Sequence, residues 1–233
     1  MKKILFIFGL ALLLVFAIGC SKEDESAETG DDTEMAQTGP MTREDSLAAI
    51  RYPVRDENNK FVTMVTDYGN MTFELYRDVA PAHADSFVAR TQEGFYDNTT
   101  FFRIIDDFMI QGGDPTGTGK GKVSYYLRAE LSELPHQEGT LAMARSSDLN
   151  SASTQFYICL ARNALTSSLD GSYTIFGHLI EGYDALDKIG SVEVVPNPKR
   201  VNRQTGEAEP SMPVDTVYLR TVYVSDAEGE EIL

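Results

Sequence analysis

Hydrophobic and polar residues alternate along two stretches of the chain, residues 61–66 and 71–76, on either side of the pair Gly69-Asn70. Alternation with a period of two puts apolar side chains on one face of a strand, and Gly-Asn pairs favour tight turns, so the segment predicts a β-hairpin. Residues 101–110 are apolar on both faces, which predicts a strand deep in the fold. Other short apolar runs predict strands at 141–145, 154–161, 173–180 and 214–224.

Two segments carry apolar residues at helical spacing. Pro81 begins the first, and Ala84, Phe87 and Val88 form its apolar stripe. The second covers residues 181–190 and ends at a glycine, the residue that most often follows a helix. Both segments are short, so they predict helices that cover the ends of a larger structure.

The remaining segments complete a mainly β architecture. A loose capping pattern from Thr42 predicts a short helix that ends before Pro53. Residues 194–213 are polar and rich in turn-forming residues, which predicts a loop. Many short strands with two or three helices indicate an all-β barrel or sandwich whose ends are closed by helices.

The N-terminal segment differs from the rest of the chain. Residues 1–19 combine a basic start, an apolar run and a small residue before Cys20. This pattern indicates a secretory signal peptide, which is too short and wrongly flanked for a stable membrane span. The sequence around Cys20 resembles the lipobox of bacterial lipoproteins, which implies cleavage before Cys20 and its acylation. The alternative is an ordinary signal peptide with an incidental cysteine.

The segment that follows is acidic and nearly free of large apolar residues, so it cannot bury enough surface to fold. Residues 20–50 are therefore expected to be a flexible tether, and residues 51–233 the folded domain. A lipid on Cys20 would anchor the chain to the membrane in the cell envelope. The expected location is the outer membrane, on its periplasmic or surface-exposed face.

Composition and motif spacing argue against several classes of function. The formal net charge is −16, so the chain lacks the basic footprint that nucleic-acid binding needs. A phosphate-binding P-loop is excluded because Gly121 follows Lys120 where the motif requires Ser or Thr. The 3 histidines lie far apart and form no ligand pair, so no metal is expected. If Cys20 carries a lipid, Cys159 has no disulfide partner.

The most informative stretch is FFRIIDDFMIQGGDPTGTGKG, residues 101–121, in which Arg103 is the only cation of the predicted strand. It resembles the signature of cyclophilin-type peptidyl-prolyl cis-trans isomerases. Residues 139–161 and 169–189 resemble two further family blocks at the family's spacing. The resemblance spans residues 61–224. It implies an eight-stranded antiparallel β-barrel capped by two α-helices, with an active groove on the outer face of the barrel.

The resemblance also implies the site residues. Arg103 and Gln111 match catalytic positions. The substrate groove would be formed by Phe108, Met109, Gly117, Ala144, Arg145, Gln155, Tyr157, Leu169 and Tyr173. Four positions depart from the family's pattern: Tyr157 replaces the usual Phe, and Arg145, Ser168 and Tyr173 stand where eukaryotic members often have Asn, Trp and His.

These residue types suit the chemistry. Rotation about an X-Pro bond faces a barrier of roughly 20 kcal/mol from amide resonance, but no bond is broken, so no cofactor is needed. A guanidinium beside the proline nitrogen would favour the twisted state over both planar states. The expected function is a monomeric isomerase that acts on proline-containing polypeptides among exported or envelope proteins. The alternative is a proline-peptide-binding chaperone or adaptor with little turnover, which the four departures motivate.

Overall fold

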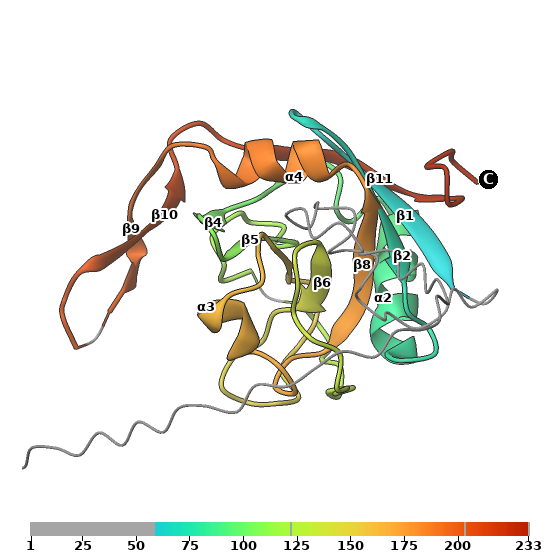
Figure 1. Cartoon of the computed structure of the whole chain (residues 1–233), viewed down its shortest axis with the longest axis horizontal. Coiled ribbons are helices and arrows are strands. Elements are labelled where there is room, and N and C mark those ends of the chain that lie inside the picture. Colours follow the sequence, from blue (N-terminus) through green and yellow to red (C-terminus); the bar gives the residue numbers. More distant parts are fainter. Residues whose placement is uncertain (1–58, 122, 203, 233) are drawn as a thin grey trace, which may run out of the picture. The chain divides into compact units, whose positions relative to one another are not determined.

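The computed structural model describes residues 59–121, 123–202 and 204–232 (Figure 1). The predicted signal peptide, the tether with Cys20 and the helix expected from Thr42 lie outside the described residues. The strands, the two later helices and all the predicted groove residues lie within them.

An antiparallel sheet forms the body of the molecule, with its strands in the order β3-β11-β1-β2-β8-β6-β7-β5-β4. The mainly β fold is therefore confirmed, with 9 strands in the sheet in place of the expected eight. The strands are β1 (Lys60–Thr66), β2 (Gly69–Leu75), β3 (Thr99–Thr100), β4 (Arg103–Ile105), β5 (Met109–Gly112), β6 (Thr140–Met143), β7 (Phe156–Cys159), β8 (Ile175–Glu181) and β11 (Tyr218–Ser225).

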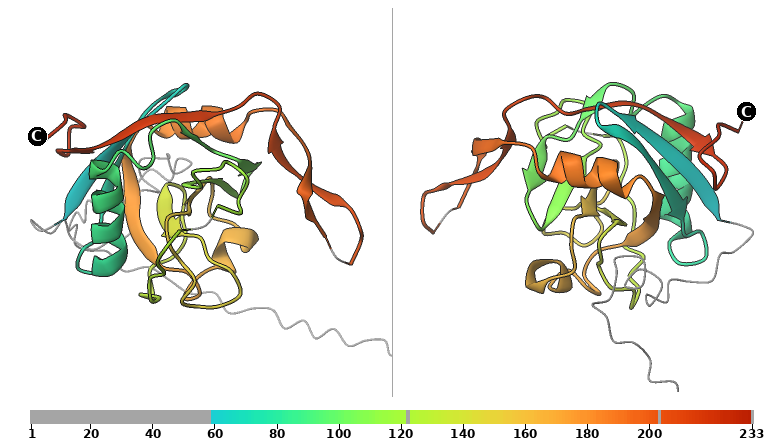
Figure 2. Two further views of the ribbon diagram at one scale, coloured as in Figure 1. Left: turned by 180° about the vertical axis from the view of Figure 1, so that it is seen from behind. Right: turned by 45° about the horizontal axis from the view of Figure 1, so that its top comes forward.

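The sheet is strongly curled (Figures 1 and 2). Its two edge strands, β3 and β4, follow each other directly in the chain. Only Phe101 and Phe102 separate β3 from β4. The backbone N–H of Phe101 donates to the carbonyl of Val217, just before β11, and that of Phe102 donates to the carbonyl of Gln111 on β5. These bonds tie the two edges of the curled sheet together and fix the start of β4.

The predicted N-terminal hairpin is present as β1 and β2, but its turn lies two residues earlier than expected. Thr66 pairs with Gly69, so Asp67 and Tyr68 are the turn residues. The hydroxyl of Thr66 donates to the carbonyl of Gly69 at 2.7 Å. This local bond closes the turn.

The prediction of one strand over residues 101–110 is wrong. A turn at Asp106 and Asp107 separates β4 from β5, and Asp107 has a positive φ of 54°. The two strands then pair with each other, with Arg103 opposite Gln111. Asp106 and Asp107 interrupt the apolar run, and such a pair is more typical of a solvated turn than of a strand, so the turn itself agrees with the sequence. The break matters for function, since it brings these two side chains together.

Two helices cover the curled sheet, in agreement with the prediction. They are α2 (Pro81–Gln92), which packs on β1, β8 and β11, and α4 (Tyr183–Gly190), which packs on β2, β4 and β5. The ring of Phe87 on α2 stacks on Tyr96, with 4.6 Å between ring centroids. Such aromatic pairs fasten α2 to the core.

A third, short helix is α3 (Ala164–Ser167), which the apolar pattern does not predict. Its N-cap Asn163 accepts hydrogen bonds from the backbone N–H groups of Leu165 and Thr166. A capping box therefore stabilises one helical turn that lacks an apolar stripe. Within the described ranges, no helix is long and apolar enough to cross a membrane.

Side chains on β5, β6 and β7 alternate between two hydrophobic clusters. On β7, Phe156 and Ile158 belong to the main core, whereas Tyr157 and Cys159 belong to a second cluster on the other face of the sheet. Met109 of β5 joins the same second cluster. The outer face of these strands is therefore partly apolar, and this is the face on which a groove is expected.

Residues 194–213 form a hairpin, so the prediction of a loop there is wrong. Its strands are β9 (Val194–Val201) and β10 (Ala208–Pro213), and they extend from the body as a two-stranded arm (Figures 1 and 2). Prolines within these segments argue against strands when the sequence is considered alone. In a two-stranded ribbon both strands are edge strands, so prolines can occupy positions where no backbone N–H donor is needed. Close to the body, β10 lies against β4.

Candidate active site

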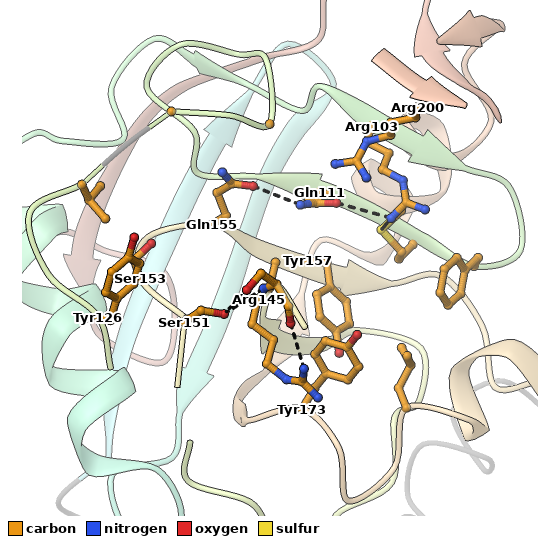
Figure 3. A pocket seen from close by; sticks show the side chains of 18 residues that line it. Arg103, Gln111, Tyr126, Arg145, Ser151, Ser153, Gln155, Tyr157, Tyr173 and Arg200 are labelled. Atoms are coloured by element: carbon orange, nitrogen blue, oxygen red, sulfur yellow. Dashed lines mark hydrogen bonds between the residues drawn. The ribbon is translucent and has the colours of Figure 1, made fainter. Parts of the chain in front are cut away.

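A pocket of about 460 Å³ lies on the outer face of β5 and β7, beside the segment that follows β6 (Figure 3). The structure brings to it the predicted residues Arg103, Phe108, Met109, Gln111, Ala144, Arg145, Gln155, Tyr157, Leu169 and Tyr173. These residues come from segments far apart in the sequence, so the curled sheet assembles the site.

Gly117 is the predicted groove residue that does not line the pocket. Gly119 and Gly121 of the same loop line it instead. Gly117 has a φ of +61°, and a Cβ there would lie 2.9 Å from the hydroxyl of Thr100. The residue therefore faces β3, where both its conformation and the lack of space favour glycine.

The guanidinium of Arg103 is the centre of the polar side of the pocket. Its Nη1 lies 3.4 Å from Oε1 of Gln111 and 3.9 Å from Sδ of Met109. Nε and Nη2 donate to the two carboxylate oxygens of Glu209 on β10, each at 2.7 Å. The side chain of Arg103 is 17% exposed, so one edge is paired and another faces the pocket.

A chain of polar contacts crosses the pocket from Arg103 (Figure 3). Gln111 accepts from Arg103 and donates through Nε2 to Oε1 of Gln155, at 3.2 Å. Arg103 can only donate, so it requires the amide oxygen of Gln111, and Oε1 of Gln155 can only accept, so it requires the amide nitrogen. The two contacts together fix the orientation of the Gln111 amide. Gln111 can thus hold Arg103 while its own position is set by Gln155.

The apolar side of the pocket is formed by Phe108, Met109, Ala144, Tyr157 and Leu169. The ring of Tyr157 packs edge-on against Tyr173, with 5.9 Å between ring centroids. Together these side chains make an apolar slot beside the Arg103 guanidinium. Such a slot accepts a compact apolar group while a cation faces one side of it.

The hydroxyl of Tyr157 points away from the slot and is hydrogen-bonded within the protein. It lies 2.8 Å from Nε2 of His136, whose Nδ1 lies 3.0 Å from Asp170. Burial alone would raise the pKa of Asp170, but hydrogen bonds from Arg162 and His136 outweigh it and lower the pKa to about 2. Asp170 is therefore an acceptor at neutral pH. His136 donates to it through Nδ1 and accepts from Tyr157 through Nε2.

Burial is also the main influence on His136 itself. It lowers the pKa of His136, against the opposing effect of Asp170. The imidazole is therefore neutral at physiological pH, which is consistent with its acceptor role toward Tyr157.

Arg145 lies at the other end of the pocket. Its guanidinium carbon is 4.4 Å from the centre of the Tyr173 ring, and its Nη2 donates to the carbonyl of Ser172 at 2.8 Å. The charge is thus stacked and hydrogen-bonded within the rim. The two positions that depart from eukaryotic members of the family, Arg145 and Tyr173, form one contact.

The glycine-rich loop beside Arg103 is fixed by Asp114, which is buried. Its carboxylate accepts from the backbone N–H groups of Thr116, Thr118 and Gly121. Burial alone would raise the pKa of Asp114, but these hydrogen bonds outweigh it and the pKa is lowered. These hydrogen bonds hold the loop in the conformation in which Gly119 and Gly121 line the pocket.

Several pocket residues do not follow from the sequence pattern: Val123, Tyr126, Ser146, Ser151, Ser153 and Arg200. The most informative is Arg200 on β9, because it adds a second cation close to Arg103. Its Nη2 would lie 3.1 Å from a Cβ added at Gly119. No local signal marks Arg200 or Glu209, since both reach the site through the arm.

Other chemistries find no support in the described part of the chain. Residues 59–232, apart from 122 and 203, contain no group of three or more His, Cys, Asp or Glu residues placed to hold a metal ion. Cys159 is buried, and burial raises the pKa of its thiol. A buried thiol with a raised pKa is a poor nucleophile.

The family model for cyclophilin type peptidyl-prolyl cis-trans isomerases matches residues 61–206. The chain belongs to this family. A peptidyl-prolyl cis-trans isomerase of Arabidopsis thaliana is 41% identical over 137 residues, which cover 57% of this chain and 81% of the relative. A bacterial relative from Acinetobacter baylyi is 41% identical over 138 residues, covering 58% of this chain and 73% of that protein.

A solved cyclophilin has the same fold. The crystal structure of a Cryptosporidium parvum cyclophilin, determined in the presence of the dipeptide Ala-Pro, has a TM-score of 0.60 and 32% identity to this chain. The match covers 71% of this chain and 99% of that one. The residues matched by the cyclophilin family model include Arg200 but end before Glu209. The carboxylate that pairs with Arg103 thus comes from beyond the matched region.

Proposed function

We propose that this cyclophilin accelerates cis–trans isomerisation of X-Pro bonds in exported or envelope proteins while they fold. The observation that carries the proposal is the position of Arg103, whose Nη1 faces Gln111 and Met109 beside the apolar slot. A proline ring in the slot would bring its nitrogen within reach of a permanent cation.

The chemistry of this arrangement is differential binding. Amide resonance holds the X-Pro bond planar, and the barrier to rotation is roughly 20 kcal/mol. In the twisted state the proline nitrogen regains its lone pair. A hydrogen-bond donor held at that nitrogen stabilises the twisted state more than either planar state, which raises the rate. Arg103 would supply the donor, and its guanidinium stays charged at every relevant pH.

The remaining groove residues would hold the substrate. Phe108, Met109, Tyr157 and Leu169 would enclose the proline ring, and Gln111 would hydrogen-bond the peptide backbone while it orients Arg103. A proline-containing dipeptide accompanies the solved cyclophilin that resembles this chain, which supports a proline-containing peptide as the ligand.

The cellular context is proposed from the N-terminal sequence. The signal-like residues 1–19, the lipobox-like Cys20 and the acidic tether support an exported chain anchored by lipid, with its domain held away from the membrane. Mass spectrometry of the N-terminal peptide tests acylation of Cys20. Under the proposal, Cys20→Ala abolishes the lipid and moves the protein from the membrane fraction to the soluble fraction. An unmodified Cys20 in the mature protein would contradict the anchor.

A second function, proline-peptide binding with little turnover, has one observation in its favour. Glu209 accepts hydrogen bonds from two nitrogens of Arg103, which leaves fewer donors for a substrate. An isomerase assay on the full-length chain, combined with a peptide-binding measurement, separates the two functions. Acceleration of an X-Pro peptide supports the enzyme, whereas affinity without acceleration supports the binding module.

A further inference from the structure

Glu209 makes the strongest contact to the cation of the site. Its two oxygens accept from Nε and Nη2 of Arg103, both at 2.7 Å. This is the planar two-point pairing for which a guanidinium and a carboxylate are matched, and it restricts the guanidinium more than a single bond does. The side chains are 17% and 31% exposed, so solvent only partly screens the pair.

The pair holds Arg103 from the side away from the pocket. Glu209 does not line the pocket, although Arg103, Gln111 and Met109 do. The Nε–Nη2 edge of the guanidinium is thus turned toward the arm, and Nη1 is turned toward Gln111. Because Glu209 lies outside the pocket, its carboxylate does not obstruct the groove.

The charges on the arm give a second reason why a carboxylate at position 209 stabilises the arrangement of Arg103. Arg200 is half-buried near Arg103, and burial followed by repulsion from Arg103 lowers the pKa of Arg200. Glu209 acts in the opposite direction on Arg200. Burial alone would raise the pKa of Glu209, but the hydrogen bonds and charge of Arg103 outweigh it, so Glu209 is ionised at neutral pH. It therefore offsets the repulsion between two neighbouring cations.

We propose that Glu209 is a positioning residue, which holds the Arg103 guanidinium so that Nη1 faces the proline slot. This role deepens the proposed isomerase function and rests on it. Without the carboxylate, Arg103 keeps its charge but can rotate on its flexible stem, away from Arg200 and from the slot. The arm then belongs to the site, because docking of β10 against β4 brings Glu209 to Arg103.

Kinetics of the full-length chain test the role. Glu209→Gln keeps the size of the side chain but removes the charge, and it is expected to lower kcat by about tenfold, since small misplacements of a catalytic group are costly. KM should change by less than about twofold, because Glu209 does not line the pocket. Glu209→Asp, which keeps the charge, should recover part of the rate. Glu207→Gln, an exposed change of equal charge on the same arm, should leave both constants unchanged.

The outcomes separate this role from the proposed function. A wild-type chain without isomerase activity overturns both. An active wild type with an equally active Glu209→Gln variant overturns only the positioning role. A faster variant also overturns it, because it means that the carboxylate competes with the substrate for Arg103. A measurement on the wild-type chain alone remains if the variants fail to fold. The Nε–H of Arg103 should then exchange slowly with solvent in nitrogen-detected NMR, and rapid exchange would overturn the pairing.

Discussion

The hydroxyl of Tyr157 donates a hydrogen bond to Nε2 of His136, at a distance of 2.8 Å, on the inner side of the apolar slot. Both residues are buried, and their rings lie nearly parallel, with 9° between the ring planes. The departure from the phenylalanine usual in the family is thus matched by a buried acceptor. Tyr157 presents its ring to the slot and its hydroxyl to the protein, so the slot remains apolar.

This relationship predicts that Tyr157→Phe costs stability more than activity. The variant leaves Nε2 of His136 buried without its tyrosine partner, which costs about 1–3 kcal/mol of unfolding free energy. The ring that faces the slot is unchanged, so kcat/KM should stay within about threefold of wild type. Urea unfolding and the isomerase assay measure the two effects. Tyr126→Phe is the matched control, because Tyr126 also lines the pocket but is 69% exposed.

A large loss of activity without a loss of stability in Tyr157→Phe would contradict this account. It would mean that the hydroxyl reaches the substrate and is not directed away from it.

Asp170 predicts a pH dependence of stability. Its pKa in the folded chain is about 2, below the ordinary value of 3.8, because hydrogen bonds from Arg162 and His136 outweigh the effect of burial. A lowered carboxyl pKa stabilises the fold above the unfolded-state pKa, and this contribution is lost as the pH falls from about 4 toward 2. The wild type should therefore lose more unfolding free energy between pH 5 and pH 3 than Asp170→Asn does.

Urea unfolding at the two pH values measures that difference. Asp78→Asn serves as the control, since Asp78 is exposed on the surface. Equal losses of unfolding free energy in wild type and Asp170→Asn over this range would contradict a stabilising role for the ionised Asp170 carboxylate.

Arg200 predicts a preference among substrates. It lines the pocket as a half-buried cation close to Arg103, so an acidic side chain beside the proline should pair with it. Peptides with Glu beside the proline should be isomerised with a kcat/KM roughly two- to fivefold higher than peptides with Lys, the range expected of a partly exposed ion pair. Added salt should narrow the difference.

Two variants on β9 locate this preference. Arg200→Ala should remove it, whereas Lys199→Ala should keep it, because Lys199 is exposed and does not line the pocket. Equal kcat/KM values for the Glu and Lys peptides with the wild-type chain would show that Arg200 does not contribute to substrate preference.

The sequence predicts the groove well where its residues lie on strands with a strict period of two. Phe156 and Tyr157 are adjacent aromatic residues, and alternation alone sends one to the core and the other to the outer face. The resemblance then names the residues that share this face. The pair Asp106-Asp107 indicates a turn, but the register that brings Arg103 opposite Gln111 is known only from the structure.

The arm is the part that the sequence does not reveal. Its strands contain several prolines and few apolar residues, so local preferences indicate a loop. The arm is formed by backbone pairing between β9 and β10 and by the docking of β10 on β4, which is distant in the sequence. Arg103 and Glu209 are separated by 106 positions, and an ion pair at that separation leaves no local signal. Gly117 shows the converse limit, since a matching glycine in a turn can face away from the groove.

The most direct test of the central claim compares the isomerase activity of the wild-type chain, Arg103→Ala and Arg103→Lys on one X-Pro peptide. Lysine keeps the charge but loses the planar fork that pairs with Glu209 and faces Gln111. We expect the wild type to accelerate isomerisation and both variants to lose about a hundredfold or more in kcat/KM while they remain folded, as when a donor to the transition state is removed. Wild-type activity in Arg103→Ala, or a folded wild type that does not accelerate isomerisation, would contradict it.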